Sequence, residues 1–172
     1  MKRYPLAALF LSALGLFIAC GPPEPCIDGP CVCEEGSCDL DCDDILACAP
    51  TCNGADSCNA TCTDGCDFDC RNGTNCSVDC GVDCKVACAS ASTCDARCGA
   101  GCVYSCESAS NCSTRLGDGG SAVCTSVGTC DVTCDGRCSV TCNMVGNCNV
   151  SCKPGETPTE CPDGRRVCGQ PC

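Results

Sequence analysis

Residues 58–93 read CNATCTDGCDFDCRNGTN and then CSVDCGVDCKVACASAST, two segments of 18 residues whose cysteines fall at the same positions. Each segment follows the pattern C-x3-C-x3-C-x3-C-x5, and the pattern continues to residue 152. The first cysteine column is spaced by 18 residues throughout and contains Cys58, Cys76, Cys94, Cys112, Cys130 and Cys148. A regular repeat of this length predicts a stack of structurally equivalent coils.

Two short strands are predicted in each repeat. In Cys58–Cys62 and Cys66–Cys70, cysteines and apolar residues alternate with mostly polar ones. A period of two places the cysteines and apolar residues on one face of a five-residue strand. The Gly, Asn and Asp residues between these segments suit turns. We therefore expect an all-β protein, a small flattened parallel β-solenoid with two five-residue strands per coil, in which Phe68 and Tyr104 face inward.

The composition indicates that cross-links or metal must replace an ordinary core. The chain has 172 residues, 31 of them cysteine, with no histidine and a formal net charge of −12. Beyond residue 19 there are only 18 Leu, Ile, Val and Phe side chains, too few for the core of one domain of this size. Cysteine at this level is typical of disulfide scaffolds in an oxidising compartment.

The N-terminus has the features of an export signal. Lys2 and Arg3 precede an uncharged stretch from Leu6 to Ala19, which is too short to span a bilayer comfortably and fits a signal peptide. The stretch ends in LFIACG at residues 16–21. This ending resembles a bacterial lipobox, and the resemblance implies cleavage before Cys20 and lipidation of that cysteine. Cleavage by signal peptidase I is the alternative, but the bulky Phe17 suits its small-residue rule poorly.

The lipobox resemblance implies a lipoprotein of the bacterial cell envelope, anchored in the outer membrane and either periplasmic or surface-exposed. Loss of the two cations of the signal peptide takes the net charge from −12 to −14. Such a charge repels nucleic acid and anionic lipid, so the lipid is the expected membrane contact, and a protein or basic partner is conceivable but not identified. We divide the chain into a signal peptide (1–19), a lipidated cysteine and tether (20–25), an N-terminal disulfide cap with the first coil (26–57), the repeats (58–152) and a C-terminal disulfide cap (153–172).

The cysteine columns suggest a pairing. Without Cys20, 30 cysteines remain, and one repeat carries Leu116 and Gly120 in the second and third columns. Their joint loss suggests that these two columns pair across the short turn. The other columns pair either within a coil (Cys58 with Cys70) or across the longer turn (Cys70 with Cys76), and the even number then left at each end favours the longer turn. The cysteines expected in disulfides are Cys52, Cys58, Cys62, Cys66, Cys70, Cys76, Cys80, Cys84, Cys88, Cys94, Cys98, Cys102, Cys106, Cys112, Cys124, Cys130, Cys134, Cys138, Cys142 and Cys148.

The sequence favours a structural or surface-interaction role without catalysis or cofactor. It has no histidine to act as a base, no nucleophile elbow or phosphate loop, and no C-x-x-C pair. The alternative is a metallothionein-like envelope protein that binds metal through thiolates, although C-x3-C spacing within strands is unlike that class.

Ice binding was also considered, because the predicted architecture resembles that of cysteine-rich antifreeze solenoids. Those proteins display a regular outward array of threonines. The column before the second cysteine instead contains Thr61, Asp79, Arg97, Arg115, Thr133 and Ser151. The irregular charges in this column disfavour a flat, ice-matching face.

Overall fold

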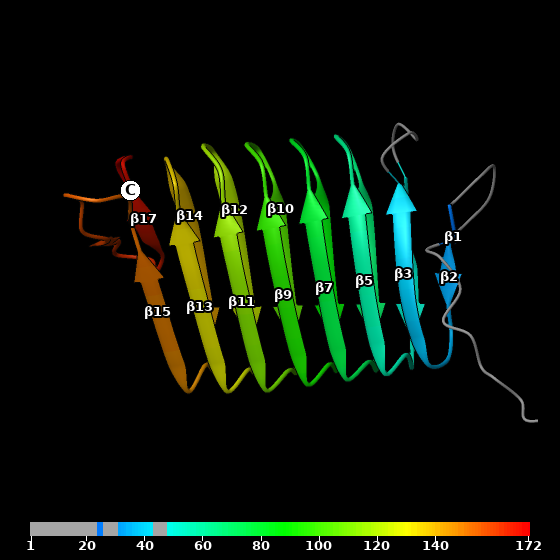
Figure 1. The fold of residues 1–172 in the computed structure, drawn as a ribbon. Coiled ribbons are helices and arrows are strands. Elements are labelled where there is room, and N and C mark those ends of the chain that lie inside the picture. Colours follow the sequence, from blue (N-terminus) through cyan, green and yellow to red (C-terminus); the bar gives the residue numbers. More distant parts are fainter. Residues whose placement is uncertain (1–23, 26–30, 43–47) are drawn as a thin grey trace, which may run out of the picture.

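The computed structural model describes residues 24–25, 31–42 and 48–172, and all regular elements in these ranges are β-strands. The strands lie side by side along a rod-shaped stack (Figure 1). The predicted all-β parallel solenoid with coils of 18 residues is confirmed. Within the described residues, no helix is long and apolar enough to cross a membrane.

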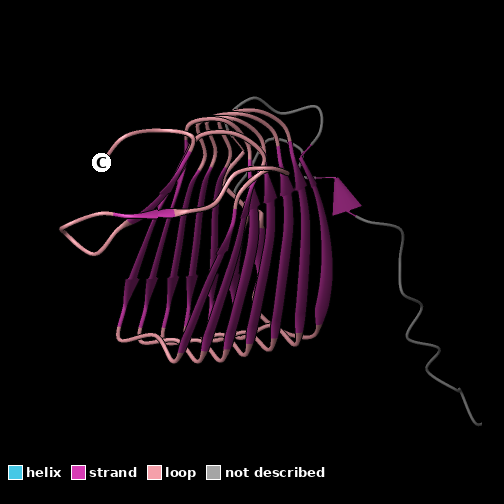
Figure 2. Cartoon of the chain, turned by 90° about the vertical axis from the view of Figure 1, so that its left-hand side faces the viewer, coloured by secondary structure: helices cyan, strands magenta, loops and turns pink. Residues whose placement is uncertain are grey.

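The strands form two sheets that face each other, and the turns between them are stacked in two rows (Figure 2). The first sheet has eight strands: β1 (Glu24–Pro25), β3 (Ser37–Cys42), β5 (Ser57–Cys62), β7 (Asn75–Cys80), β9 (Thr93–Cys98), β11 (Asn111–Leu116), β13 (Thr129–Cys134) and β15 (Asn147–Ser151). The second has nine: β2 (Val32–Cys33), β4 (Thr51–Asn53), β6 (Asp67–Arg71), β8 (Lys85–Ala89), β10 (Val103–Glu107), β12 (Gly120–Thr125), β14 (Cys138–Asn143), β17 (Arg166–Cys168) and β16 (Thr159–Glu160).

Neighbouring coils pair in register, so each sequence column becomes a row of residues along the rod. Cys58 pairs with Cys76, and Ala60 pairs with Val78. The first coil differs, because β3 pairs with β5 at an offset of 20 residues, with Cys38 opposite Cys58. Since β4 and β6 keep the offset of 18, the two additional residues lie between β3 and β4.

The core consists of the inward positions that the alternation predicted. Phe68 and Tyr104 are fully buried, which confirms their expected orientation. The Tyr104 hydroxyl donates a hydrogen bond of 3.1 Å to the carbonyl of Cys94 on the opposite sheet, so its polar end is satisfied. One inward residue is polar: Thr114 is 3% exposed, and its Oγ1 finds no hydrogen-bond partner among the described residues.

The stacked turns fix the backbone of particular residues. In the longer turn, the same position adopts a positive φ in successive coils, at Gly54, Asn72, Ser90, Ser108, Ser126 and Met144. In the short turn, Gly99 lies so close to the preceding coil that a Cβ atom would stand 2.6 Å from the Gly81 carbonyl oxygen. The coil spacing therefore requires glycine at residue 99.

The C-terminal residues extend the second sheet by antiparallel pairing. Strand β17 pairs with β14, and β16 pairs with β17. The side chain of Gln170 donates to the Cys138 carbonyl at 2.7 Å, and Arg166 donates to the Cys148 carbonyl on β15. These contacts tie the last residues of the chain to the last complete coil.

Candidate functional site

The sulfur atoms inside the solenoid are its most distinctive chemistry. One disulfide crosses the longer turn of each coil, and these bridges are Cys52–Cys58, Cys70–Cys76, Cys88–Cys94, Cys106–Cys112, Cys124–Cys130 and Cys142–Cys148. Of the two pairing schemes left open by the sequence, the structure has the one across the longer turn. Five further disulfides join Cys33–Cys38, Cys42–Cys48, Cys134–Cys138, Cys152–Cys168 and Cys161–Cys172.

At six cysteines the structure departs from the expected disulfides. We call them the sulfur row, and its members are Cys62, Cys66, Cys80, Cys84, Cys98 and Cys102. They occupy the second and third columns of three consecutive coils, where bridges across the short turn were expected, and they are present as thiols. The same two columns form a bridge only further along the chain, at Cys134–Cys138.

The physical reason lies in the choice of partners. Cys80 hydrogen-bonds with Cys62, Cys66 and Cys98, so it contacts sulfurs in its own row from two neighbouring coils. Cys134 instead stands in register with Leu116 on one side. That apolar neighbour removes one competing sulfur, which favours Cys138 as the partner of Cys134. Within the sulfur row, no pairing is singled out in this way.

The sulfur row ends at the coil that carries Leu116 and Gly120. Leu116 is completely buried and stands in register with Cys98. A Cβ atom at residue 120 would lie 3.0 Å from the Leu116 Cβ, so the larger leucine takes the space of the second side chain. A leucine and a glycine thus fill the volume that two cysteines occupy elsewhere, and this coil closes without sulfur at its short turn.

Hydrogen bonds connect the thiols to each other and to turn carbonyls. Cys84 Sγ lies 3.2 Å from the Thr63 carbonyl oxygen, and Cys102 Sγ lies 3.3 Å from that of Gly81. The hydrogen bond to Cys62, together with burial, raises the pKa of Cys66 to about 12. Hydrogen bonds from Cys102 and Cys80 lower the pKa of Cys98 below its usual range, because they stabilise its thiolate.

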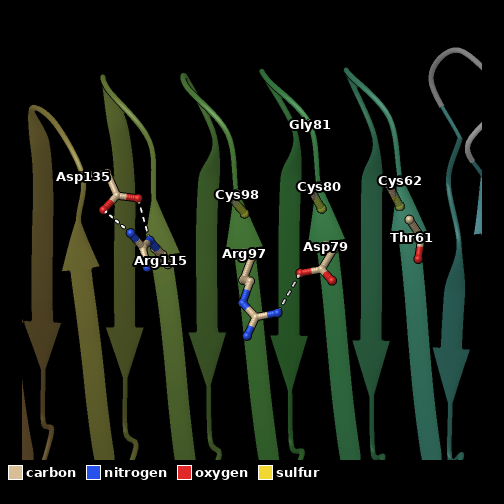
Figure 3. A pocket seen from close by; sticks show the side chains of 9 residues that line it. All are labelled: Thr61, Cys62, Asp79, Cys80, Gly81, Arg97, Cys98, Arg115 and Asp135. Atoms are coloured by element: carbon tan, nitrogen blue, oxygen red, sulfur yellow. Dashed lines mark hydrogen bonds and ion pairs between the residues drawn. The ribbon is translucent and has the colours of Figure 1, made fainter.

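A shallow hollow of about 380 Å³ gives access to one side of the sulfur row. Figure 3 shows Cys62, Cys80 and Cys98 at the same level on three neighbouring strands, at the carboxyl ends of β5, β7 and β9. Cys80 is the most exposed of the three, and Gly81 beside it has no side chain to cover it. The sulfurs therefore form part of a surface that small ions can reach.

Two guanidinium groups border the hollow (Figure 3). Arg97 and Arg115 stand in register on β9 and β11, and each reaches away from the other toward a carboxylate. Arg115 binds Asp135 through two hydrogen bonds of 2.6 and 2.9 Å, whereas Arg97 is 3.7 Å from Asp79. The sequence analysis used these arginines only as a contrast to an ice-binding face. Their place beside the sulfurs follows from the register of the coils, for which the 18-residue spacing was the available signal.

The predicted lipidation site, Cys20, lies outside the described residues. No protein-family model matches the chain, and no curated protein or solved structure matches it either.

Proposed function

We propose that this protein is a rigid structural module of the bacterial cell envelope, anchored by lipid at Cys20, that acts as a spacer or interaction surface and not as an enzyme. The observation that supports the structural role most directly is the constant register of the coils, each with a disulfide across its longer turn. Each such bridge spans a sequence separation of six residues and stabilises by about 2 kcal/mol through restriction of the unfolded chain.

A protease assay tests the rigid-module proposal. We expect residues 58–152 to survive trypsin under non-denaturing, non-reducing conditions, since their backbone amides are held in the stacked sheets. Reduction of the disulfides should expose the same residues to cleavage. Equal cleavage in the presence and absence of reductant would contradict the proposal.

Anchoring is tested separately with Cys20→Ser in a bacterial host. If Cys20 carries the lipid, this variant should lose radiolabelled palmitate and leave the membrane fraction. Pro22→Ala, which changes only the tether, serves as the matched control and should remain in the membrane. Palmitate labelling of Cys20→Ser at the level of the control would contradict the anchor and leave the protease result unaffected.

A further inference from the structure

The sulfur row is a donor set without an assigned role in the structural function. Coil closure does not require it, since the coil with Leu116 and Gly120 has the same strands and turns. The long-turn disulfides of the three coils are complete without its members. Three pairs of thiols thus lie inside a scaffold that other bonds hold together.

The geometry of the first three sulfurs fits a soft metal ion. The Sγ atoms of Cys62, Cys66 and Cys80 all lie within 4.8 Å of one another. Thiolates select soft ions such as Cu(I) and Zn(II). A structural zinc site takes four protein ligands in a tetrahedron, whereas Cu(I) accepts a trigonal set of three sulfurs. Three close sulfurs from two adjacent coils therefore favour Cu(I).

We propose that the sulfur row binds Cu(I) through its thiolates, with Cys62, Cys66 and Cys80 as the first site and the remaining three sulfurs as its continuation along the rod. Each thiol that becomes a ligand releases its proton to solvent, and copper enters and stays as Cu(I), so no electron is transferred. The hydrogen-bonded S–H groups are the atoms whose protons the metal replaces.

The surroundings of the row support both access and charge compensation. Cys80 borders the hollow and provides a route for the ion from solvent. The guanidinium of Arg97, which makes only a long contact to Asp79, lies beside the same hollow. Its positive charge offsets part of the excess negative charge of a cluster with more thiolates than metal ions.

The test is an anaerobic competition titration of the full exported chain against the Cu(I)–bicinchoninate complex. We expect the protein to take at least one equivalent of Cu(I) from the probe, with X-ray absorption that shows only sulfur ligands. Cys80→Ser should weaken the uptake at least tenfold, because Cys80 belongs to the first site and borders the hollow. The matched control is the double variant Cys134→Ser/Cys138→Ser, which removes two sulfurs of the same spacing outside the row and should bind as much copper as the unmodified chain.

A second measurement on the unmodified chain guards against misfolding of the variants. Iodoacetamide should label the six cysteines of the row after denaturation without reductant, and bound Cu(I) should protect them before denaturation. Disulfides within the row, found by peptide mapping of the unreduced chain, would overturn the proposal. Copper uptake unchanged in Cys80→Ser would overturn it as well. Neither result bears on the role as a rigid module.

Discussion

Individual side chains inside the solenoid are held in a narrow space between two sheets, so a single polar atom has a measurable effect. Thr114 occupies the row that contains Ala96 and Val132 on the neighbouring strands. Its hydroxyl is buried without a hydrogen-bond partner among the described residues, and a buried unsatisfied donor costs about 1–3 kcal/mol. The position therefore has the shape of valine but carries the cost of a hydroxyl.

We predict that Thr114→Val stabilises the protein by about 1 kcal/mol, because it removes the unsatisfied hydroxyl and keeps the volume. The measurement is the midpoint of urea unfolding under non-reducing conditions. Val132→Thr is the matched control in the same row, and it should lower the midpoint because it introduces a second buried hydroxyl. A lower midpoint for Thr114→Val would show that the hydroxyl is satisfied in solution.

A titratable pair links two successive short turns. Asp118 accepts hydrogen bonds from the backbone N–H of Arg137 at 2.9 Å and from its guanidinium at 2.7 and 3.0 Å. The side-chain hydrogen bond from Arg137 is the main reason why the pKa of Asp118 is lowered to about 2. Because the folded-state pKa lies below the unfolded value of about 3.9, the pair stabilises at higher pH and loses its effect as the pH falls from about 4 to about 2.

NMR titration of the Asp118 side-chain carboxyl carbon checks this prediction. We expect a midpoint near pH 2 in the unmodified chain and a return toward the ordinary aspartate value in Arg137→Gln. Arg165→Gln, which removes a different ion pair, should leave the Asp118 titration unchanged. An Asp118 midpoint that is the same in all three proteins would mean that the turns do not stack as closely as the structure has them.

At the scale of strands and turns, the close contact between coils is set by backbone atoms. A Cβ atom at residue 99 would meet the Gly81 carbonyl oxygen at 2.6 Å and its carbonyl carbon at 2.8 Å. Backbone of a central coil cannot move aside without breaking the ladder, and overpacking of this kind costs about 1–3 kcal/mol. We predict that Gly99→Ala lowers stability by about 2 kcal/mol in urea unfolding. Val82→Ala in the preceding turn, an exposed position, should have little effect, and equal midpoints for the two variants would contradict the prediction.

The strands and their inward residues could be predicted because two periods reinforce each other. A period of two defines the faces of segments such as Cys58–Cys62, and the period of 18 repeats the assignment in every coil. The offset of 20 at β3 was not predicted, because the additional residues fall before the regular columns begin. The sequence also could not show that the sulfur row holds thiols, since cysteines of identical spacing form a bridge at Cys134–Cys138. The difference depends on which sulfurs lie nearby in the adjacent coils, and the hollow likewise depends on stacked residues from several coils.

For the molecule as a whole, the repeat implies that stability is a sum over coils and the contacts between neighbours. Each coil contacts only the coils before and after it through in-register strands. Residues 94–111 form one coil whose internal hydrogen bond, from Tyr104 to Cys94, is contained within it. Its removal would bring β7 next to β11 and Cys88 next to Cys112, the remaining partners of two long-turn disulfides.

We therefore predict that deletion of residues 94–111 yields a folded rod shorter by about 4.8 Å, the spacing of adjacent strands. A new bridge between Cys88 and Cys112 should replace two former ones, which peptide mapping of the unreduced chain can detect. Deletion of residues 94–102 removes only half a coil and is the control. That deletion shifts every later strand out of register and should abolish cooperative urea unfolding. If the whole-coil deletion unfolded as the half-coil deletion does, interactions beyond nearest neighbours would have to hold the rod together.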